Sequence, residues 1–161
     1  MPTKAEAALD KLKARVGSEE GTSNWHQIDQ SQINLFADAT GDHQFIHVDP
    51  ERAAELSPYK VTIAHGFLTL SLLPSLGSSI PPSDPAAYEG VVMGVNYGLD
   101  RVRFPAPVKV DSKVRARREL LSAELKAPNT LQLKQRVTIE IEGEDKPGCV
   151  ADSLTRLIYA D

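Results

Sequence analysis

The chain has 161 residues, of which 41% are apolar and 25% charged, and its formal net charge is -4. This balance is typical of one soluble globular domain, and the acidic charge does not favour nucleic acid, whose partners usually carry a basic face. No apolar run approaches the roughly 20 residues that cross a bilayer, and the N-terminus lacks a signal peptide's apolar run. Because the single Cys149 cannot form an internal disulfide, we expect a structural thiol in a cytoplasmic protein.

Residues 1–23 are expected to form an N-terminal helix and a loop within a single domain that spans residues 1–161. Apolar residues recur on one stripe over residues 4–16, which predicts the helix. The composition of residues 18–23 predicts the loop, and residues 25–28 predict a short strand.

The next segment carries clear helix boundaries. Asp29 is suited to cap a helix that Gly41 ends. Residues 42–48 mix polar and aromatic side chains, which predicts a loop. Asp49 and Pro50 then begin a short helix, the first as its cap and the second at its first position.

Residues 61–76 form the most apolar stretch of the chain. They leave little room for a polar face, so we expect a buried helix that starts near Ala64 and that Pro74 kinks or ends. Residues 77–87 are rich in Pro and Ser and predict a loop with the character of a mobile flap.

From Val91 onward apolar residues alternate with polar ones, the period of β-strands. The basic residues of 113–118 alternate with Val114 and Ala116, which predicts a strand with a basic outer face. Helices followed by an antiparallel meander indicate an α+β fold whose sheet wraps the buried helix, and dimerisation is one way to cover the sheet edges. The four long strands are expected at about 91–103, 108–116, 131–141 and 149–159.

Three of the four histidines lie between positions 43 and 65, and the pair Asp42 and His47 lies among them. Five residues apart in a helix, these side chains would point about 140° from one another, whereas in a loop both can reach one pocket. A carboxylate and an imidazole that share a water can move two protons, and each such group is typically worth 10²–10⁴-fold in rate. A capping Asp with a His packed beneath it accounts for the same residues, and residue types alone favour that interpretation.

A metal site is a weaker interpretation of the same segment. His43 and His47 are four residues apart, a spacing that joins ligands on a helix, but Gly41 and the Asp49-Pro50 pair place the segment outside a helix. No third ligand stands at a familiar spacing, so we expect no metal.

His65 and Gly66 stand where the buried helix is expected to begin. A helix N-terminus offers unpaired N–H groups and the positive end of the dipole, and glycine allows a ligand to approach the backbone closely. This arrangement suits an oxygen that develops negative charge. A glycine needed for close packing of the helix on the sheet explains the residue equally well.

Together, FADATGDHQFIHVDPERAA and TIAHGFLTLSLLP resemble the MaoC-like, or hydratase-2, family of (R)-specific enoyl-CoA hydratases. The stretch VNYGLDRVRFPAPV is similar to the nodulation protein N-like branch, and the motifs cover roughly residues 24–115. The matching positions are Phe36, Gly41, Asp42, His47, Asp49, Pro50, Ala53, Ala54, Ala64, His65 and Gly66.

The resemblance implies a hot-dog fold, usually dimeric, in which an antiparallel sheet wraps a long central helix. It implies that Asp42 and His47 hold the catalytic water and that the Gly66 N–H binds the thioester oxygen. Water would add syn across a trans-2-enoyl-CoA to give an (R)-3-hydroxyacyl-CoA, with no cofactor beyond the coenzyme A of the substrate.

The resemblance also implies substrate contacts around this core. Many members have Asn-Pro where this chain has Gln44 and Phe45, so the amide is one carbon further out and the pocket is narrower. Some members orient the Asp with a serine of the central helix, a role that passes here to Ser71 or Ser75. The expected substrate contacts are Gln44, Phe45, His65, Asn96, Tyr97, Arg101 and Arg103. Arg101, Arg103 and Lys109 suit the phosphates of coenzyme A, and a solvated strand edge explains these three basic residues equally well.

Two other functions stay open. A hot-dog thioesterase would use one carboxylate to activate water at the carbonyl, and the His beside the Asp argues against it. A non-catalytic acyl-thioester-binding accessory protein is kept open by the nodulation-like stretch, although the intact Asp42 and His47 pair argues against it.

Overall fold

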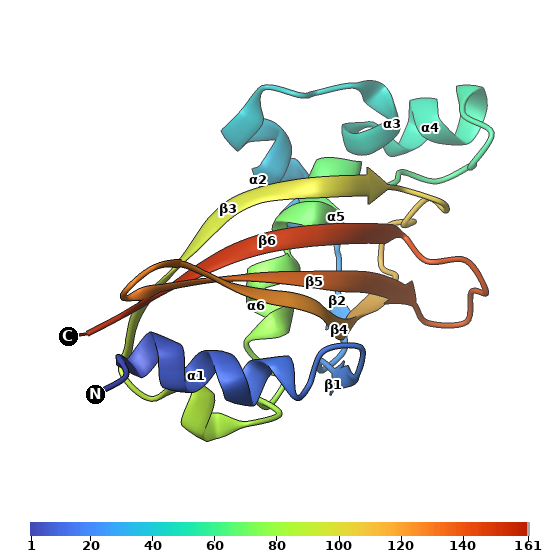
Figure 1. Ribbon diagram of the computed structural model, residues 1–161. Helices are drawn as coiled ribbons and strands as arrows, with labels where there is room; N and C mark the ends of the chain where they lie inside the picture. The colour runs from blue at the N-terminus through green and yellow to red at the C-terminus, as the bar shows by residue number, and fades with distance from the viewer. Residues whose placement is uncertain (161) are drawn as a thin grey trace.

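The computed structural model describes residues 1–160, and its centre is a six-stranded antiparallel sheet (Figure 1). The strands follow one another in the order β1-β4-β5-β6-β3, and β2 pairs with β4 beside β1. Three of the four predicted long strands are present near their expected positions, whereas the strand expected at 108–116 is wrong in its bounds and forms as β4 over Lys113–Ala127. The chain turns at residues 110–111, where Asp111 is left-handed, so the strand can begin only after this turn. The strands are β1 (Glu19–Thr22), β2 (His26–Gln27), β3 (Val91–Arg103), β4 (Lys113–Ala127), β5 (Thr130–Ile141) and β6 (Cys149–Tyr159).

Short helices cover the sheet. Helices α5 and α6 lie end to end across the strands, α2 to α4 gather at one end of the sheet, and α1 lies at the other (Figure 1). None of the helices within residues 1–160 is long and apolar enough to cross a membrane. The helices are α1 (Lys4–Lys13), α2 (Gln30–Thr40), α3 (Phe45–Val48), α4 (Pro50–Leu56), α5 (Gly66–Ser71), α6 (Leu73–Gly77) and the 3₁₀ helix η1 (Pro85–Tyr88).

The inner face of the sheet carries two separate hydrophobic clusters, each buried under different helices. The first cluster lies under α2, α5 and α6 and includes Ile33, Leu68, Leu76, Val114, Ala116, Val137, Ile139, Cys149 and Ala151. The second cluster lies under α1 and η1 and includes Ala5, Ala8, Leu12, Ala87, Leu120, Leu131, Leu133, Leu157 and Tyr159.

The central helix differs from the prediction of one long buried element. It begins at Gly66 and breaks at Leu72, and a second helix restarts with Pro74 in its first turn, where proline's missing N–H costs nothing. The helix is also open on one side, since Phe67 is 69% exposed and packs edge-on against Phe104.

Other predicted boundaries change in the structure. Residues 19–22, expected as a loop, form β1 because their backbone pairs with the edge of β4. Residues 45–48, also expected as a loop, form the one-turn helix α3. The first helix ends at Lys13, and Val16 lies exposed beyond it.

The basic run of β4 divides between the two faces of the sheet. Arg115 and Arg117 lie on the outer face, where both pair with Glu140. Arg118 instead shares the inner face with Val114 and Ala116, so the predicted wholly basic outer face is wrong at this position.

Candidate active site

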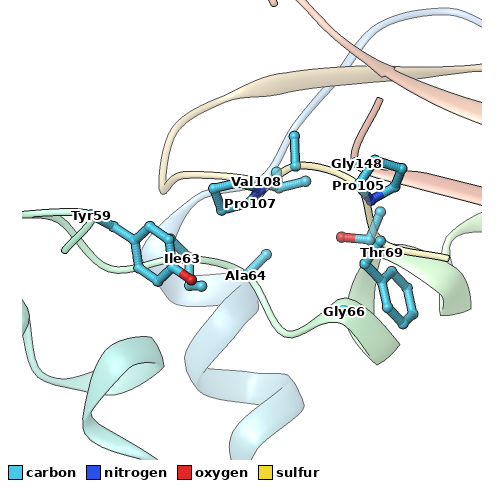
Figure 2. A pocket seen from close by; sticks show the side chains of 11 residues that line it. Tyr59, Ile63, Ala64, Gly66, Thr69, Pro105, Pro107, Val108 and Gly148 are labelled. Carbon is cyan, nitrogen blue, oxygen red and sulfur yellow. The ribbon is translucent and has the colours of Figure 1, made fainter. Parts of the chain in front are cut away.

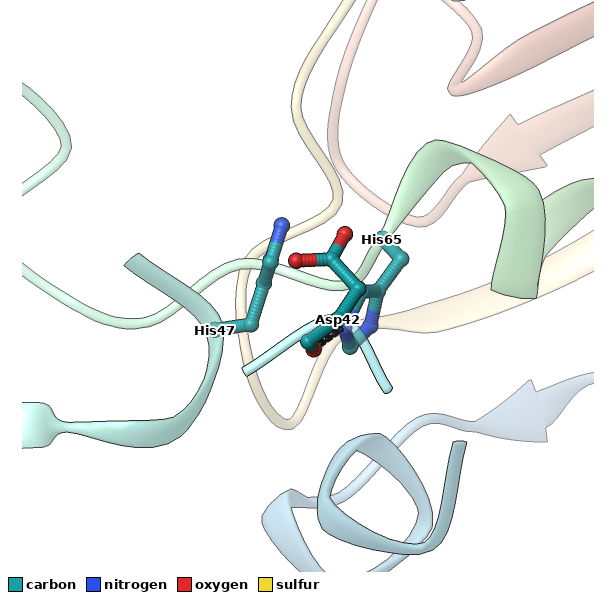
Figure 3. A group of neighbouring side chains, drawn as sticks. All are labelled: Asp42, His47 and His65. Atoms are coloured by element: carbon teal, nitrogen blue, oxygen red, sulfur yellow. Dashed lines mark hydrogen bonds between the residues drawn. The ribbon is translucent and has the colours of Figure 1, made fainter. Parts of the chain in front are cut away.

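Three side chains from separate segments meet where the first turn of α5 approaches α2 and α3 (Figure 3). Gly41 ends α2 in a left-handed conformation, and Asp42 follows directly. His47 lies on α3 and His65 precedes the first residue of α5. The ligand-type atoms of Asp42, His47 and His65 lie within 4.8 Å of one another, so the structure brings the predicted pair together and adds a third group.

His47 is held in one tautomer by the backbone. Its Nδ1–H donates to the carbonyl of Ile63 at 2.7 Å, because a carbonyl can only accept, and the Nε2 lone pair therefore stays free. The ring is 7% exposed, and burial lowers the pKa of His47 below its ordinary value of 6.5. The Ile63 carbonyl raises this pKa, His65 lowers it and Asp42 raises it, with burial the largest cause. His47 is therefore neutral at pH 7, with an acceptor nitrogen aimed to the same side as the Asp42 carboxylate (Figure 3).

His65 connects the other two residues. Its Nε2–H donates to the backbone carbonyl of Asp42 at 2.9 Å, and its ring stacks on that of His47 with centroids 3.9 Å apart. Phe36 packs against the same ring at 4.9 Å. His65 is 2% exposed, so its ring is shielded from solvent.

Asp42 itself is exposed, and its carboxylate accepts one hydrogen bond at 3.3 Å, from the backbone N–H of Gln44. The serines expected to orient it do not reach it. The Ser71 hydroxyl donates to the Phe67 carbonyl, and Ser75 is exposed on α6. His65 holds the Asp42 segment instead, a contact across 23 residues that no local sequence pattern reveals.

Gly66 borders a hollow of about 320 Å³, whose lining also includes Ile63 and Ala64 just before it in the chain (Figure 2). It is the first residue of α5, where the backbone N–H has no acceptor within the helix. A Cβ at this position would lie 3.1 Å from the ring of Phe104, a tight contact that close packing also avoids with a glycine. Both expectations for Gly66 are thus compatible with the structure. The walls of the hollow come from Tyr59, Ile63, Ala64, Thr69, Pro105, Pro107, Val108 and Gly148.

The predicted substrate contacts on α3 lie close to the pair. Gln44 is exposed before the first residue of α3, and Phe45 is half-buried with the guanidinium of Arg52 4.7 Å above its ring.

The predicted contacts on β3 lie further along the sheet. Asn96 and Tyr97 border a second hollow, of about 410 Å³, between β3 and the α5–α6 helices. Tyr97 also lies under the guanidinium of Arg156, at 3.7 Å. Arg101 and Arg103 are exposed near the end of β3, and Arg103 donates to the neighbouring Val102 carbonyl.

The same three residues are the one group of possible metal ligands found in residues 1–160. One nitrogen of each ring is already engaged with a carbonyl, and the remaining nitrogen of His65 is buried. Only the His47 Nε2 and the Asp42 carboxylate face outward, fewer than the three protein ligands of a typical catalytic zinc site. His43, considered above with His47, points elsewhere and pairs with Asp38.

Comparison with known proteins adds a family and close relatives. The family model described as "MaoC like domain" matches residues 11–141. The chain is 50% identical over 147 residues to the 3-hydroxyacyl-thioester dehydratase Z of Mycobacterium tuberculosis, covering 91% of this chain and 93% of that one. It is 49% identical over 150 residues to the nodulation protein N of Rhizobium leguminosarum bv. viciae, covering 93% and 91%.

Solved structures support the fold. The unliganded R-hydratase PhaJ1 from Pseudomonas aeruginosa aligns with a TM-score of 0.68 and 23% identity, over 98% of this chain and 86% of that chain. The (R)-hydratase from A. caviae aligns with a TM-score of 0.64 and 21% identity, over 87% and 94%. The expected hot-dog architecture is therefore confirmed.

Proposed function

The chain belongs to the MaoC-like domain family and is a hydro-lyase, and from this premise we propose that it is an (R)-specific hydratase of trans-2-enoyl-CoA thioesters. The observation that carries the proposal is the free Nε2 of His47 beside the exposed Asp42 carboxylate. The relative named as a 3-hydroxyacyl-thioester dehydratase supports the same reaction in reverse.

In this mechanism one water lies between the two groups. The neutral His47 Nε2 takes one proton as the water oxygen bonds to C3, and the Asp42 carboxylate accepts a hydrogen bond from the other hydrogen. The C2–C3 π electrons move toward the thioester carbonyl to give an enolate. The protonated His47 Nε2 then returns its proton to C2 from the same face, which makes the addition syn and leaves the enzyme unchanged.

The Gly66 N–H stabilises the enolate oxygen. It lies at the start of α5, beside the 320 Å³ hollow, and has no helical acceptor. One preorganised donor of this kind is typically worth about 2.7–4 kcal/mol of transition-state stabilisation. Because glycine has no Cβ, the substrate oxygen can approach this N–H closely.

His65 acts as a positioning residue in this proposal, in place of the substrate contact expected from the resemblance. It donates to the Asp42 carbonyl and stacks on His47, so one ring sets the separation of both acid/base groups. Its burial supports this role.

We also propose a homodimer through β3. This 13-residue strand is the edge of the sheet, and nearly all of its length is exposed. Exposed edges of this length are normally covered, because their free N–H and C=O groups template association. Five large apolar side chains lie exposed on the strand: Val92, Met93, Val95, Tyr97 and Leu99.

The hydration of crotonyl-CoA tests the function. We expect loss of the enoyl absorbance and formation of the (R)-3-hydroxy product without release of free thiol. Thiol release without hydration would instead identify a thioesterase. Tight binding of acyl-CoA without either reaction would identify an accessory protein.

A further inference from the structure

A band of polar side chains crosses the inner face of the sheet and separates its two hydrophobic clusters. Four strands contribute to it, so the band is a feature of the whole sheet and not of one strand. Its members are Asn96 on β3, Arg118 on β4, Gln135 on β5, and Ser153 and Thr155 on β6.

The band lines a cavity of about 440 Å³. Helix α6 and residues 77–88 close the opposite side, and the predicted flap is held there by the buried Ile80 and Ala87. Apolar walls flank the polar band, from Leu133 on one side and Val137 on the other. The cavity is therefore a mixed site, with apolar sides and a polar floor.

Arg118 has few partners for a buried cation. Its side chain is 17% exposed, and its Nη2 lies 3.6 Å from Glu20, beyond hydrogen-bond distance. Its Nη1 makes one long contact of 3.4 Å with the Gly77 carbonyl, and its buried Nε has no partner within residues 1–160. The guanidinium has five N–H donors, so most of them stay available.

Glu20 balances the charge. Its carboxylate is 2% exposed and accepts a 2.7 Å hydrogen bond from the Gln135 side chain. Tyr88 lines the same cavity, and the pKa of its hydroxyl is raised by burial first and by Glu20 second, while Arg118 lowers it. The site thus presents hydrogen-bond donors without a net charge.

A buried hydrogen-bond donor without an acceptor destabilises the folded protein, most of all when the donor is a charged group. An apolar residue at position 118 would avoid this cost and would join the two hydrophobic clusters into one core. We propose that this cavity receives the distal end of the acyl chain and that Arg118 selects chains with a neutral oxygen there, a hydroxyl or a ketone. This inference rests on the proposed hydratase function.

Helices α5 and α6 give the direction from the catalytic end to this cavity, because Gly66 begins α5 and Gly77, at the end of α6, borders the cavity. The cavity adjoins the hollow between β3 and α5–α6, since both are bordered by Leu73, Pro74 and Asn96. Gly66 and Gly77 are 11 residues apart, or about 16 Å at the helical rise. An extended chain of about fourteen carbons spans that length, because the zigzag of the chain advances only about 1.2 Å per C–C bond.

Binding and turnover of matched chains test the inference. The substrates are trans-2-tetradecenoyl-CoA and its ω-hydroxy and ω-carboxy counterparts, and the saturated versions report binding without turnover. We expect the ω-hydroxy chain to bind about tenfold more tightly than the plain chain, as one hydrogen bond to a charged group implies. The ω-carboxy chain is expected to bind no better than the plain chain, because the buried Glu20 repels it.

The double variant Glu20→Gln/Arg118→Met removes both buried charges together, so that neither is left unpaired. It is expected to lose the preference for the hydroxyl, with a melting temperature that shows it is folded. Arg117→Met is the matched control, because this neighbour lies on the outer face, and it should keep the preference.

The outcomes separate the two proposals. Equal binding of the plain and ω-hydroxy chains by the wild-type protein overturns the inference, as does an unchanged preference in the double variant. A wild-type protein that binds the saturated chains with this preference but does not hydrate crotonyl-CoA overturns the proposed function alone.

Discussion

Two Asp–His pairs with the same five-residue spacing overlap in this chain, and the fold gives them opposite environments. The exposed His43 ring donates a hydrogen bond to the Asp38 carboxylate at 2.9 Å, and this hydrogen bond raises the pKa of His43. Asp42 and His47 have no direct bond to each other in the structure, and burial lowers the pKa of His47.

The difference shows what makes an Asp–His pair chemically useful. In the outer pair each group satisfies the other, so neither is free to act on a third molecule. In the inner pair the Ile63 carbonyl fixes one nitrogen of His47, and His65 fixes the backbone of Asp42. The reactive atoms are left without partners on the open side, which is the arrangement a shared water requires.

The largest expected effect follows from Asp42→Asn, which keeps the shape of the side chain but removes its charge. It should lower kcat/KM for crotonyl-CoA by about 10²–10⁴-fold, the usual worth of an acid/base group. Asp38→Asn is the matched control and should stay near the wild-type rate. Equal losses in both variants would mean that the two pairs do not differ in role.

Substitution of His65 tests how the inner pair is held. His65→Phe keeps the ring against His47 but loses the donor to the Asp42 carbonyl, and it should lower kcat by about tenfold to a hundredfold, as small misplacements of reacting groups do. KM should change little. His65→Gln restores a donor and should recover part of the rate, and a variant that changes only KM would indicate a substrate contact instead.

The two histidines should also differ in their effect on pH dependence. Since the pKa of His47 is lowered in the folded state, activity should persist below pH 6.5 and fall as the pH drops through that lowered pKa. As the pH falls, His47 of the unfolded chain binds a proton before His47 of the folded protein does, because its pKa is the higher of the two. The His47 contribution to folding stability is therefore present above pH 6.5 and is lost as the pH falls below it.

Chemical denaturation from pH 8 to 5 and rate profiles over the same range measure both effects. His43→Gln should retain the acidic limb of the rate profile, while His47→Gln should lose the part of the stability profile due to His47. An acidic limb that disappears with His43 would assign the titration to the outer pair.

The smallest effect is expected from the outer pair itself. Asp38→Asn should lower the pKa of His43 toward 6.5, visible in an NMR titration of the ring protons. The rate of hydration should not follow this shift. A pKa of His43 that stays raised in the variant would show that Asp38 is not its main partner.

Much of the fold could be predicted because its signals are local. Asp29 and Asp49 both cap helices as expected, and period-two alternation located three of the four long strands, whereas β4 begins and ends later than expected. Strand β1 was missed because its four residues carry no apolar alternation and are defined only by pairing with β4.

The candidate site residues could be proposed from the sequence, but their geometry could not. Asp42, His47 and Gly66 follow from the family motif, whereas the contact between His65 and the Asp42 carbonyl depends on how α5 meets the end of α2. Arg118 was interpreted within a basic outer face, and only the strand's register shows that it points inward.

The most direct test of the account compares crotonyl-CoA hydration by His47→Gln and His43→Gln, two identical changes four residues apart. The account predicts that His47→Gln loses about 10²–10⁴-fold in kcat/KM while the protein stays folded and His43→Gln remains near the wild-type rate. Retained hydration in a folded His47→Gln protein would contradict the assignment of His47 and Asp42 as the acid/base pair.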